Sequence, residues 1–150
     1  MQTILVNIAI VLGSFIVMEG VAWSSHKFLM HGFLWKVHQD HHTGTKSFFQ
    51  RNDLFFFIFA IPSWLFMMFG IMAGCDYRMW IGIGIALYGI AYFMVHEVII
   101  HQRLKFFSRS NNRYIVAVRK AHKAHHKHLG KENGECFGML MVPFKYFKRQ

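Results

Sequence analysis

Histidines fall into two copies of one spaced pattern along this chain. Each copy has a His-x4-His pair followed by a His-x2-His-His run, and His128 alone stands outside the two copies. The patterned histidines are His26, His31, His38, His41, His42, His96, His101, His122, His125 and His126. The neutral imidazole nitrogen is the commonest metal ligand near physiological pH. The repeated spacing therefore predicts one site for several metal ions, assembled from two halves of the chain.

The two kinds of spacing differ in what an α-helix does with them. Residues three and four apart share one face of a helix, so each His-x2-His-His trio is expected to converge. A separation of five residues corresponds to about 140° around an ideal helix, so each His-x4-His pair is expected to splay. Either the helix ends between the two histidines of a pair, or they bind different ions. This spread favours two metals over one.

Iron suits this ligand set better than the other metals considered. A closed structural zinc site often uses cysteine, and neither Cys75 nor Cys136 lies in the pattern. Copper and nickel accept imidazole but rarely need so many, and a haem would leave most of these histidines unexplained. Imidazole-rich sites with open positions are typical of iron and O2 chemistry. We therefore expect two iron ions.

Four carboxylates lie close to the histidine pattern. Glu19 precedes His26 by seven residues and occupies nearly the same helical face. The others are Asp40, Asp53 and Glu97. Each is expected to accept a hydrogen bond from the far ring nitrogen of a ligand histidine and so to fix its tautomer. Direct ligation, above all by Glu19, is the alternative, and Asp53 could instead cap the helix that follows it.

Three apolar runs have the length of membrane-spanning helices. They cover residues 4–23, 54–73 and roughly 79–100, with one charge in the first run and none in the second. A bilayer core of roughly 30 Å needs about 20 apolar residues in a helix. We therefore predict an all-α fold, an integral membrane helical bundle with about three spans plus cytoplasmic histidine-bearing helices. Residues 1–150 are expected to form a single domain.

Three spans place both histidine-bearing segments on the same side of the membrane, so the two halves of the pattern can meet. Residues 96–150 carry 12 lysines and arginines against 3 acidic residues. The positive-inside rule then predicts an inner-membrane protein with its site on the cytoplasmic side. The basic tail favours contact with anionic lipid first and docking of an acidic electron donor second. Nucleic-acid binding is not indicated, because no known nucleic-acid module is present.

Short sequence words around the histidines carry a resemblance to a known family. They are HKFLMHG (26–32), HQDHHT (38–43), NDL (52–54), YFMVHEVIIHQR (92–103), AHKAHH (121–126) and CFGML (136–140). Through them the chain, from about Glu19 to Pro143, resembles the bacterial β-carotene hydroxylases. These belong to the fatty acid hydroxylase/sterol desaturase superfamily of membrane di-iron oxygenases. Glu97 follows His96, at a position where the family pattern leads us to expect aspartate.

This resemblance implies hydroxylation of the β-ionone ring of carotenoids at carbon 3, which converts β-carotene to β-cryptoxanthin and zeaxanthin. It implies O2 as cosubstrate, two electrons from a ferredoxin-type donor, and a di-iron centre at the cytoplasmic end of a helical bundle. No catalytic residue is expected beyond the metal ligands.

Aromatic side chains are expected to line a channel for the polyene, with lipid contact or packing as the alternative. The candidates are Phe48, Phe49, Tyr88 and Tyr92.

Two other functions stay open. One is a related hydroxylase or desaturase of fatty acyl or sterol substrates, and the other is a metal carrier without enzymatic activity.

Overall fold

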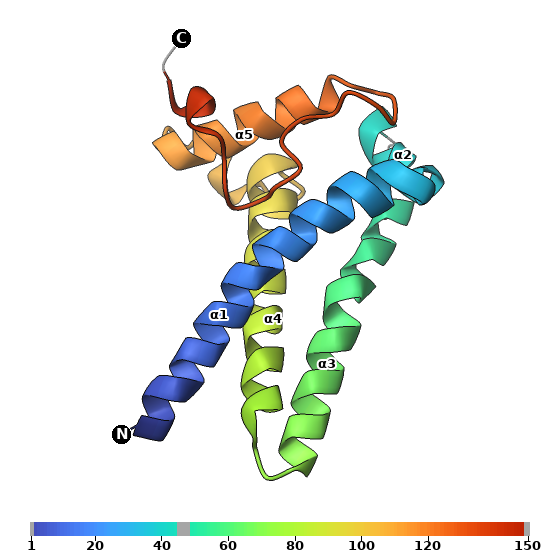
Figure 1. Cartoon of the computed structure of the whole chain (residues 1–150). Coiled ribbons are helices and arrows are strands. Elements are labelled where there is room, and N and C mark those ends of the chain that lie inside the picture. Colours follow the sequence, from blue (N-terminus) through green and yellow to red (C-terminus); the bar gives the residue numbers. More distant parts are fainter. Residues whose placement is uncertain (1, 45–48, 149–150) are drawn as a thin grey trace. The chain divides into compact units, whose positions relative to one another are not determined.

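The structure is a computed structural model that describes residues 2–44 and 49–148, and within these ranges it contains helices and no strand. The elements, traced in Figure 1, are α1 (Gln2–Ser24), η1 (Ser25–Phe33), α2 (Trp35–Thr43), η2 (Arg51–Phe55), α3 (Phe56–Met72), α4 (Tyr77–Phe93), η3 (Met94–Ile100), η4 (Lys105–Phe107), α5 (Arg113–His126) and η5 (Phe144–Phe147). Of these, η1 and η3 are π-helical and the other η elements are 3-10 helices. The predicted all-α class is confirmed.

Three helical stretches in the described part of the chain are long and apolar enough to cross a membrane. They are Thr3–Phe33, Arg51–Met72 and Tyr77–Ile100, and they overlap the three predicted runs. Their exposed faces are apolar, as at Leu12 and Ile16, which are 57% and 70% exposed. A helix that is hydrophobic all round is typical of a membrane span. The prediction of a multi-pass membrane protein with three spans is confirmed.

The chain divides into two compact units. The first consists of Met1–Gly20 and Leu54–Ala91, and the second of Val21–Asp53 and Tyr92–Gln150. The first unit therefore holds most of the apolar residues of the spans, and the second holds every histidine. The expectation of a single functional domain stays a prediction.

Glycines let the helices of the first unit approach one another closely. In this unit α3 and α4 form an antiparallel hairpin (Figure 1). The Ser63 hydroxyl on α3 donates to the carbonyl of Gly82 on α4 at 2.9 Å. A Cβ added at Gly84 would lie 2.6 Å from the carbonyl oxygen of Val11 and would also collide with the Ser14 hydroxyl. Small residues at such contacts are typical of helix packing in membranes.

Replacing Gly84 with alanine is expected to destabilise the protein by about 1–3 kcal/mol, the usual range for overpacking. The added methyl group must displace the backbone of α1 at Val11 as well as the Ser14 hydroxyl. The matched control is Gly89→Ala on the same helix, where a Cβ meets nothing within 4 Å. The midpoint of thermal unfolding in detergent measures both variants. Equal midpoints for the two would contradict the close packing at Gly84.

The second unit is organised around α5, which packs on η3 and η5. The helix begins after Asn112, whose Oδ1 accepts from the backbone N–H groups of Tyr114 and Ile115 and so caps its first turn. Val118 on this helix is buried with Val95 of η3 and Met139. This small apolar core holds α5 against η3, and both elements carry histidines.

Candidate metal centre

The second unit gathers nine of the ten patterned histidines into two groups, within the part of the chain that the structure describes. In each group the potential ligand atoms lie within 4.8 Å of one another. The five-histidine group consists of His26, His31, His38, His42 and His125. The four-histidine group consists of His41, His96, His101 and His122. Each group draws on both halves of the sequence pattern, as the pattern predicted.

The two π-helical elements position the His-x4-His pairs. His26 and His31 lie in η1, and their ring centroids are 5.3 Å apart. His96 begins a turn of η3 that His101 closes, because the His101 N–H donates to the His96 carbonyl at 2.9 Å. This i→i+5 bond brings residues five apart over one another, and such π-turns frequently occur at functional sites. Both members of each pair lie in one group, so the pairs do not splay as an ideal α-helix predicts, and which ion each histidine binds stays a prediction.

The His-x2-His-His trios are divided between the groups. On α2, His38 and His42 belong to the five-histidine group and His41 to the four-histidine group. On α5, His122 and His125 likewise lie in different groups. On α2 the division falls at the His41–His42 step, because neighbouring residues on an α-helix point about 100° apart. The expectation that each trio converges on one point is therefore also wrong.

His126 completes the pattern but lies in neither group. Its ring stacks on His42 at 4.5 Å, with 13° between the planes, and lies 4.4 Å from the ring of His122. It also lies 4.7 Å from the ring of His41, so it contacts members of both groups. Its Nε2 is buried and has no hydrogen-bond partner among the described residues. Its role as a ligand stays a prediction.

Neutral oxygen atoms hold the Nδ1 atoms of the five-histidine group. Four of these oxygen atoms are backbone carbonyls of residues 128–137, a segment that we call the carbonyl loop. These contacts run from His26 to Phe137 at 3.0 Å, from His31 to Lys131 at 3.1 Å, from His42 to His128 at 3.1 Å and from His125 to Glu135 at 2.8 Å. The Nδ1 of His38 contacts Asn52 Oδ1 at 2.6 Å. A carbonyl can only accept, so each Nδ1 carries the proton and each Nε2 is a free lone pair.

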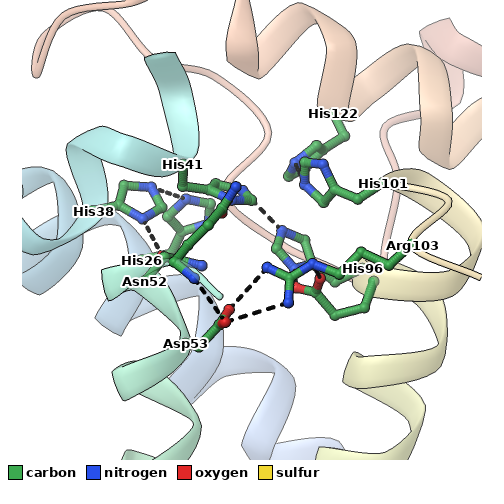
Figure 2. Close-up of polar contacts among 11 residues, drawn as sticks. His26, His38, His41, Asn52, Asp53, His96, His101, Arg103 and His122 are labelled. Carbon is green, nitrogen blue, oxygen red and sulfur yellow. Dashed lines mark hydrogen bonds and ion pairs between the residues drawn. The ribbon is translucent and has the colours of Figure 1, made fainter. Parts of the chain in front are cut away.

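The four-histidine group is held in a different way. The Nδ1 of His96 donates to Glu97 Oε1 at 2.6 Å, and the Nδ1 of His41 donates to Gln50 Oε1 at 3.1 Å. Figure 2 shows the rings of His41, His96, His101 and His122 directed toward one another. One group therefore rests on neutral acceptors, and the other includes a carboxylate.

The Nε2 atoms meet at distances that suit metal ligands. The separations are 3.2 Å for His26–His38, His38–His42 and His31–His125, 3.1 Å for His41–His96 and 3.0 Å for His101–His122. Two nitrogens bound to one ion at about 2.1 Å and at right angles are roughly 3.0 Å apart. In the five-histidine group every Nε2 is a bare lone pair, so these contacts repel unless a cation lies among them. The donor set therefore fits a metal ion in each group.

The electrostatic environment keeps these imidazoles neutral. Burial is the largest cause of a lowered pKa at the patterned histidines outside the spans, and neighbouring imidazoles add to it. The pKa falls to about 4 at His38 and His126, to about 3 at His42 and His101, and to about 2 at His125. The pKa values of His41 and His122 are also held well below the ordinary value. Ligands that are neutral at pH 7 bind a metal without first losing a proton.

Comparison with known proteins assigns the chain to a family. The model of the fatty acid hydroxylase family matches residues 11–145. The chain belongs to the fatty acid hydroxylase family. The resemblance read from the sequence words is thereby confirmed, because several curated relatives are named β-carotene hydroxylases.

The relatives of this hydroxylase include bacterial and plant proteins. It is 40% identical over 136 residues to the β-carotene hydroxylase of Pseudescherichia vulneris, an alignment that covers 91% of this chain and 77% of the relative. It is 39% identical over 137 residues to the β-carotene hydroxylase of Pantoea ananas, covering 91% and 78%. The chloroplastic β-carotene 3-hydroxylase of Gentiana lutea is 32% identical over 140 residues, which are 90% of this chain and 42% of the plant protein. No solved structure matches this chain.

The four predicted carboxylates of this hydroxylase occupy different positions. Glu97 contacts His96 directly, as described above. Asp53 accepts from the backbone N–H of Gln50 at 3.0 Å, and Asp40 accepts from the backbone N–H of Arg51 at 2.7 Å. Glu19, in the first unit, accepts from the Tyr88 hydroxyl at 2.7 Å. A direct contact with a patterned histidine is thus present at Glu97, and the supporting roles of the other three stay predictions.

The predicted channel residues of the hydroxylase are also dispersed. Phe48 lies outside the described residues. Phe49 is 76% exposed, whereas Tyr88 is fully buried and contacts the edge of Phe15 at 5.6 Å. The Tyr92 ring lies 5.4 Å from the ring of His96. Contact with substrate stays a prediction for each of them.

Three supporting residues of the hydroxylase were not predicted as part of the site. Asn52 stands in the NDL word, in which only Asp53 carried a predicted role. Arg103 stands in the word YFMVHEVIIHQR without a predicted role, and Gln50 carries no signal. The four carbonyls of the carbonyl loop could not be found from the sequence, since every residue has a carbonyl.

Proposed function

We propose that this hydroxylase uses a histidine-ligated di-iron centre to hydroxylate the β-ionone ring of a carotenoid at carbon 3. The convergence of nine imidazoles in two groups, counted over the described residues, is the observation that carries the metal centre. The curated relatives, named β-carotene hydroxylases and up to 40% identical, support the substrate class.

Iron fits the donor set of the two groups. Both consist of neutral imidazoles, with no thiolate among their members. On a six-coordinate ion, five nitrogen ligands leave one position open and four leave two, which suits iron and O2 chemistry. When bound, the two irons supply the redox chemistry that places one oxygen atom of O2 in a C–H bond. The other atom leaves as water, with two electrons from the donor and two protons.

The chain's own residues orient the ligands and exclude water. The carbonyl loop and Asn52 fix five Nδ1–H tautomers, so that five Nε2 atoms point inward. His38 and His125 are 2% and 0% exposed. A dry and rigid ligand shell keeps solvent from competing for the open positions, and it protects reactive oxygen species from side reactions.

The substrate and the electron donor are expected to reach the protein from different phases. A polyene dissolves in the bilayer, and the three spans place the enzyme there. The donor is a ferredoxin-type protein with an acidic surface, supported by exposed basic residues such as Arg109 and Arg113. The positive-inside rule supports an inner-membrane location with the di-iron centre on the cytoplasmic side.

Co-expression with the enzymes that make β-carotene tests this function. The expected result is conversion of β-carotene to β-cryptoxanthin and zeaxanthin, identified by chromatography and mass spectrometry. Magnetic resonance of the product reports whether the hydroxyl is at carbon 3. An unchanged carotenoid profile, with iron-loaded protein present in the membrane, would overturn the proposal.

A related hydroxylase of fatty acyl or sterol substrates is the second candidate, because the matching family model carries the name fatty acid hydroxylase. Analysis of membrane lipids from the same cells separates the two. Hydroxylated or desaturated acyl chains beside untouched β-carotene would favour this second function. Altered metal content of the cells without any new product would favour a metal carrier.

A further inference from the structure

The Arg103 guanidinium joins two carboxylates beside the four-histidine group. Its Nε lies 2.6 Å from Glu97 Oε2, its Nη2 lies 2.9 Å from Asp53 Oδ1, and its Nη1 donates to Asp53 Oδ2 at 3.3 Å. The three side chains are mostly shielded, with exposures of 20% for Arg103, 11% for Glu97 and 31% for Asp53. The planar fork of arginine can bind two carboxylates at once with fixed directions.

The local backbone returns Arg103 to this position. The π-helical element η3 ends at Ile100, His101 caps it, and Gln102 follows with a φ of 54°. The Arg103 N–H then donates back to the Glu97 carbonyl at 2.9 Å, which closes the helix end. A left-handed residue followed by such a bond is a common helix termination, but the left-handed residue is usually glycine. Gln102 thus adopts an unfavourable backbone conformation at the point where the chain brings Arg103 toward Glu97.

Each carboxylate leads from Arg103 to a different histidine. Glu97 accepts from the Nδ1 of His96 at 2.6 Å. Asp53 accepts from the Gln50 N–H at 3.0 Å, and Gln50 Oε1 in turn accepts from the Nδ1 of His41 at 3.1 Å. The two histidines meet again on their other side, where their Nε2 atoms are 3.1 Å apart. The contacts therefore form a closed ring, much of which can be followed in Figure 2.

We propose that Arg103 is a positioning residue for the ion of the four-histidine group. It holds Glu97 and Asp53 in place, and through them it fixes the directions in which His96 and His41 present their Nε2 atoms. This inference rests on the proposed metal centre and adds to it. The Nδ1 atoms of the five-histidine group donate to the carbonyl loop and to Asn52, so the ion of that group is held independently of the ring.

The test is metal retention by purified, iron-loaded protein with Arg103 changed to glutamine or to lysine. Loss of a supporting contact around a ligand typically costs about 10- to 100-fold in metal affinity. Chelator is expected to extract one of the two ions about 10- to 100-fold faster from Arg103→Gln than from the wild type, and the other at an unchanged rate. Arg103→Lys is expected to behave similarly, since one ammonium group cannot span both carboxylates in the arginine geometry.

Two other arginines serve as controls. Arg119 donates to the backbone carbonyls of Ile99 and Phe107 at 2.8 and 2.7 Å, so Arg119→Gln removes the structural hydrogen bonds of a half-buried arginine without touching the ring. Arg78 pairs with Asp76 at 2.8 Å, so Arg78→Gln removes an arginine–carboxylate pair in the first unit. Both variants are expected to keep two ions with wild-type extraction rates, even if their thermal stability falls.

If chelator extracts both ions from Arg103→Gln at wild-type rates, or extracts both faster by the same factor, the positioning role is overturned. The Mössbauer spectrum of the iron provides a second readout, in which one of two iron sites is expected to change and the other to stay as it was. Neither readout needs a substrate. A wild-type protein that binds two irons and leaves carotenoids unchanged would refute the proposed substrate while leaving the role of Arg103 standing.

Discussion

Replacing His38 with alanine is expected to abolish hydroxylation and to lower the metal content from about two ions per chain to about one. His38 is 2% exposed, and its Nε2 lies 3.2 Å from the Nε2 atoms of both His26 and His42. Its loss removes a ligand from the centre of the five-histidine group and also leaves Asn52 Oδ1 without its histidine donor. Metal analysis of purified protein and product analysis in a carotenoid-making host measure the two effects.

His128 provides the matched control for this substitution. It is exposed, and its contact with the five-histidine group is made by its backbone carbonyl, which accepts from His42 Nδ1 at 3.1 Å. His128→Ala retains that carbonyl, so both ions and wild-type activity are expected. A His38→Ala variant that keeps two ions and full activity would refute the ligand assignment.

The spans and the meeting of the two histidine segments could be predicted from the sequence because both depend only on the length and the number of the apolar runs. In a bilayer, a run of about 20 apolar residues forms a membrane-spanning helix. With three such runs, the segments after the first and the third lie on one side, and the structure brings His26 and His125 into one group. The length and apolar character of the runs determine this outcome without any detail of packing.

The division of histidines between the groups could not be predicted, because it depends on local departures from an ideal α-helix. An ideal helix separates His96 from His101 by about 140°, whereas the observed i→i+5 bond places them together. On α2 the helix is regular, but the expectation treated a trio as one face and overlooked the angle of about 100° between His41 and His42. The π-turns bring the members of each pair together, whereas the α2 trio divides at its His41–His42 step and the α5 trio divides between His122 and His125.

The supports of the two groups would give the two proposed ions different surroundings. Carbonyl and amide oxygens hold the Nδ1 atoms of the five-histidine group, whereas a carboxylate, Glu97, accepts from His96 in the four-histidine group. A carboxylate partner makes an imidazole a stronger donor than a carbonyl partner does. The ions are therefore expected to be inequivalent, and a change in one set of supports should disturb one ion before the other.

Gly134→Val is expected to release the ion of the five-histidine group while the other ion stays bound, with at least a tenfold loss of activity by the usual cost of disturbed ligand support. A Cβ at Gly134 would already lie 3.0 Å from the Phe137 ring and 3.5 Å from the His31 ring. Phe137 packs against the rings of His26 and His125 at 5.5 and 5.3 Å, and its carbonyl accepts from His26. The branched side chain of valine therefore presses on the ligands and on their supporting loop together.

Gly130 lies in the same carbonyl loop and provides the comparison. A Cβ at Gly130 meets nothing within 4 Å, so Gly130→Val changes the composition of the loop without filling space beside the histidines. This variant is expected to keep two ions and wild-type activity. Chelator extraction followed over time distinguishes the sites, because Gly134→Val should accelerate release from the group that Arg103→Gln leaves unchanged. If both glycine variants lose metal equally, the sensitivity belongs to the loop as a whole and not to the contact of Gly134 with Phe137 and His31.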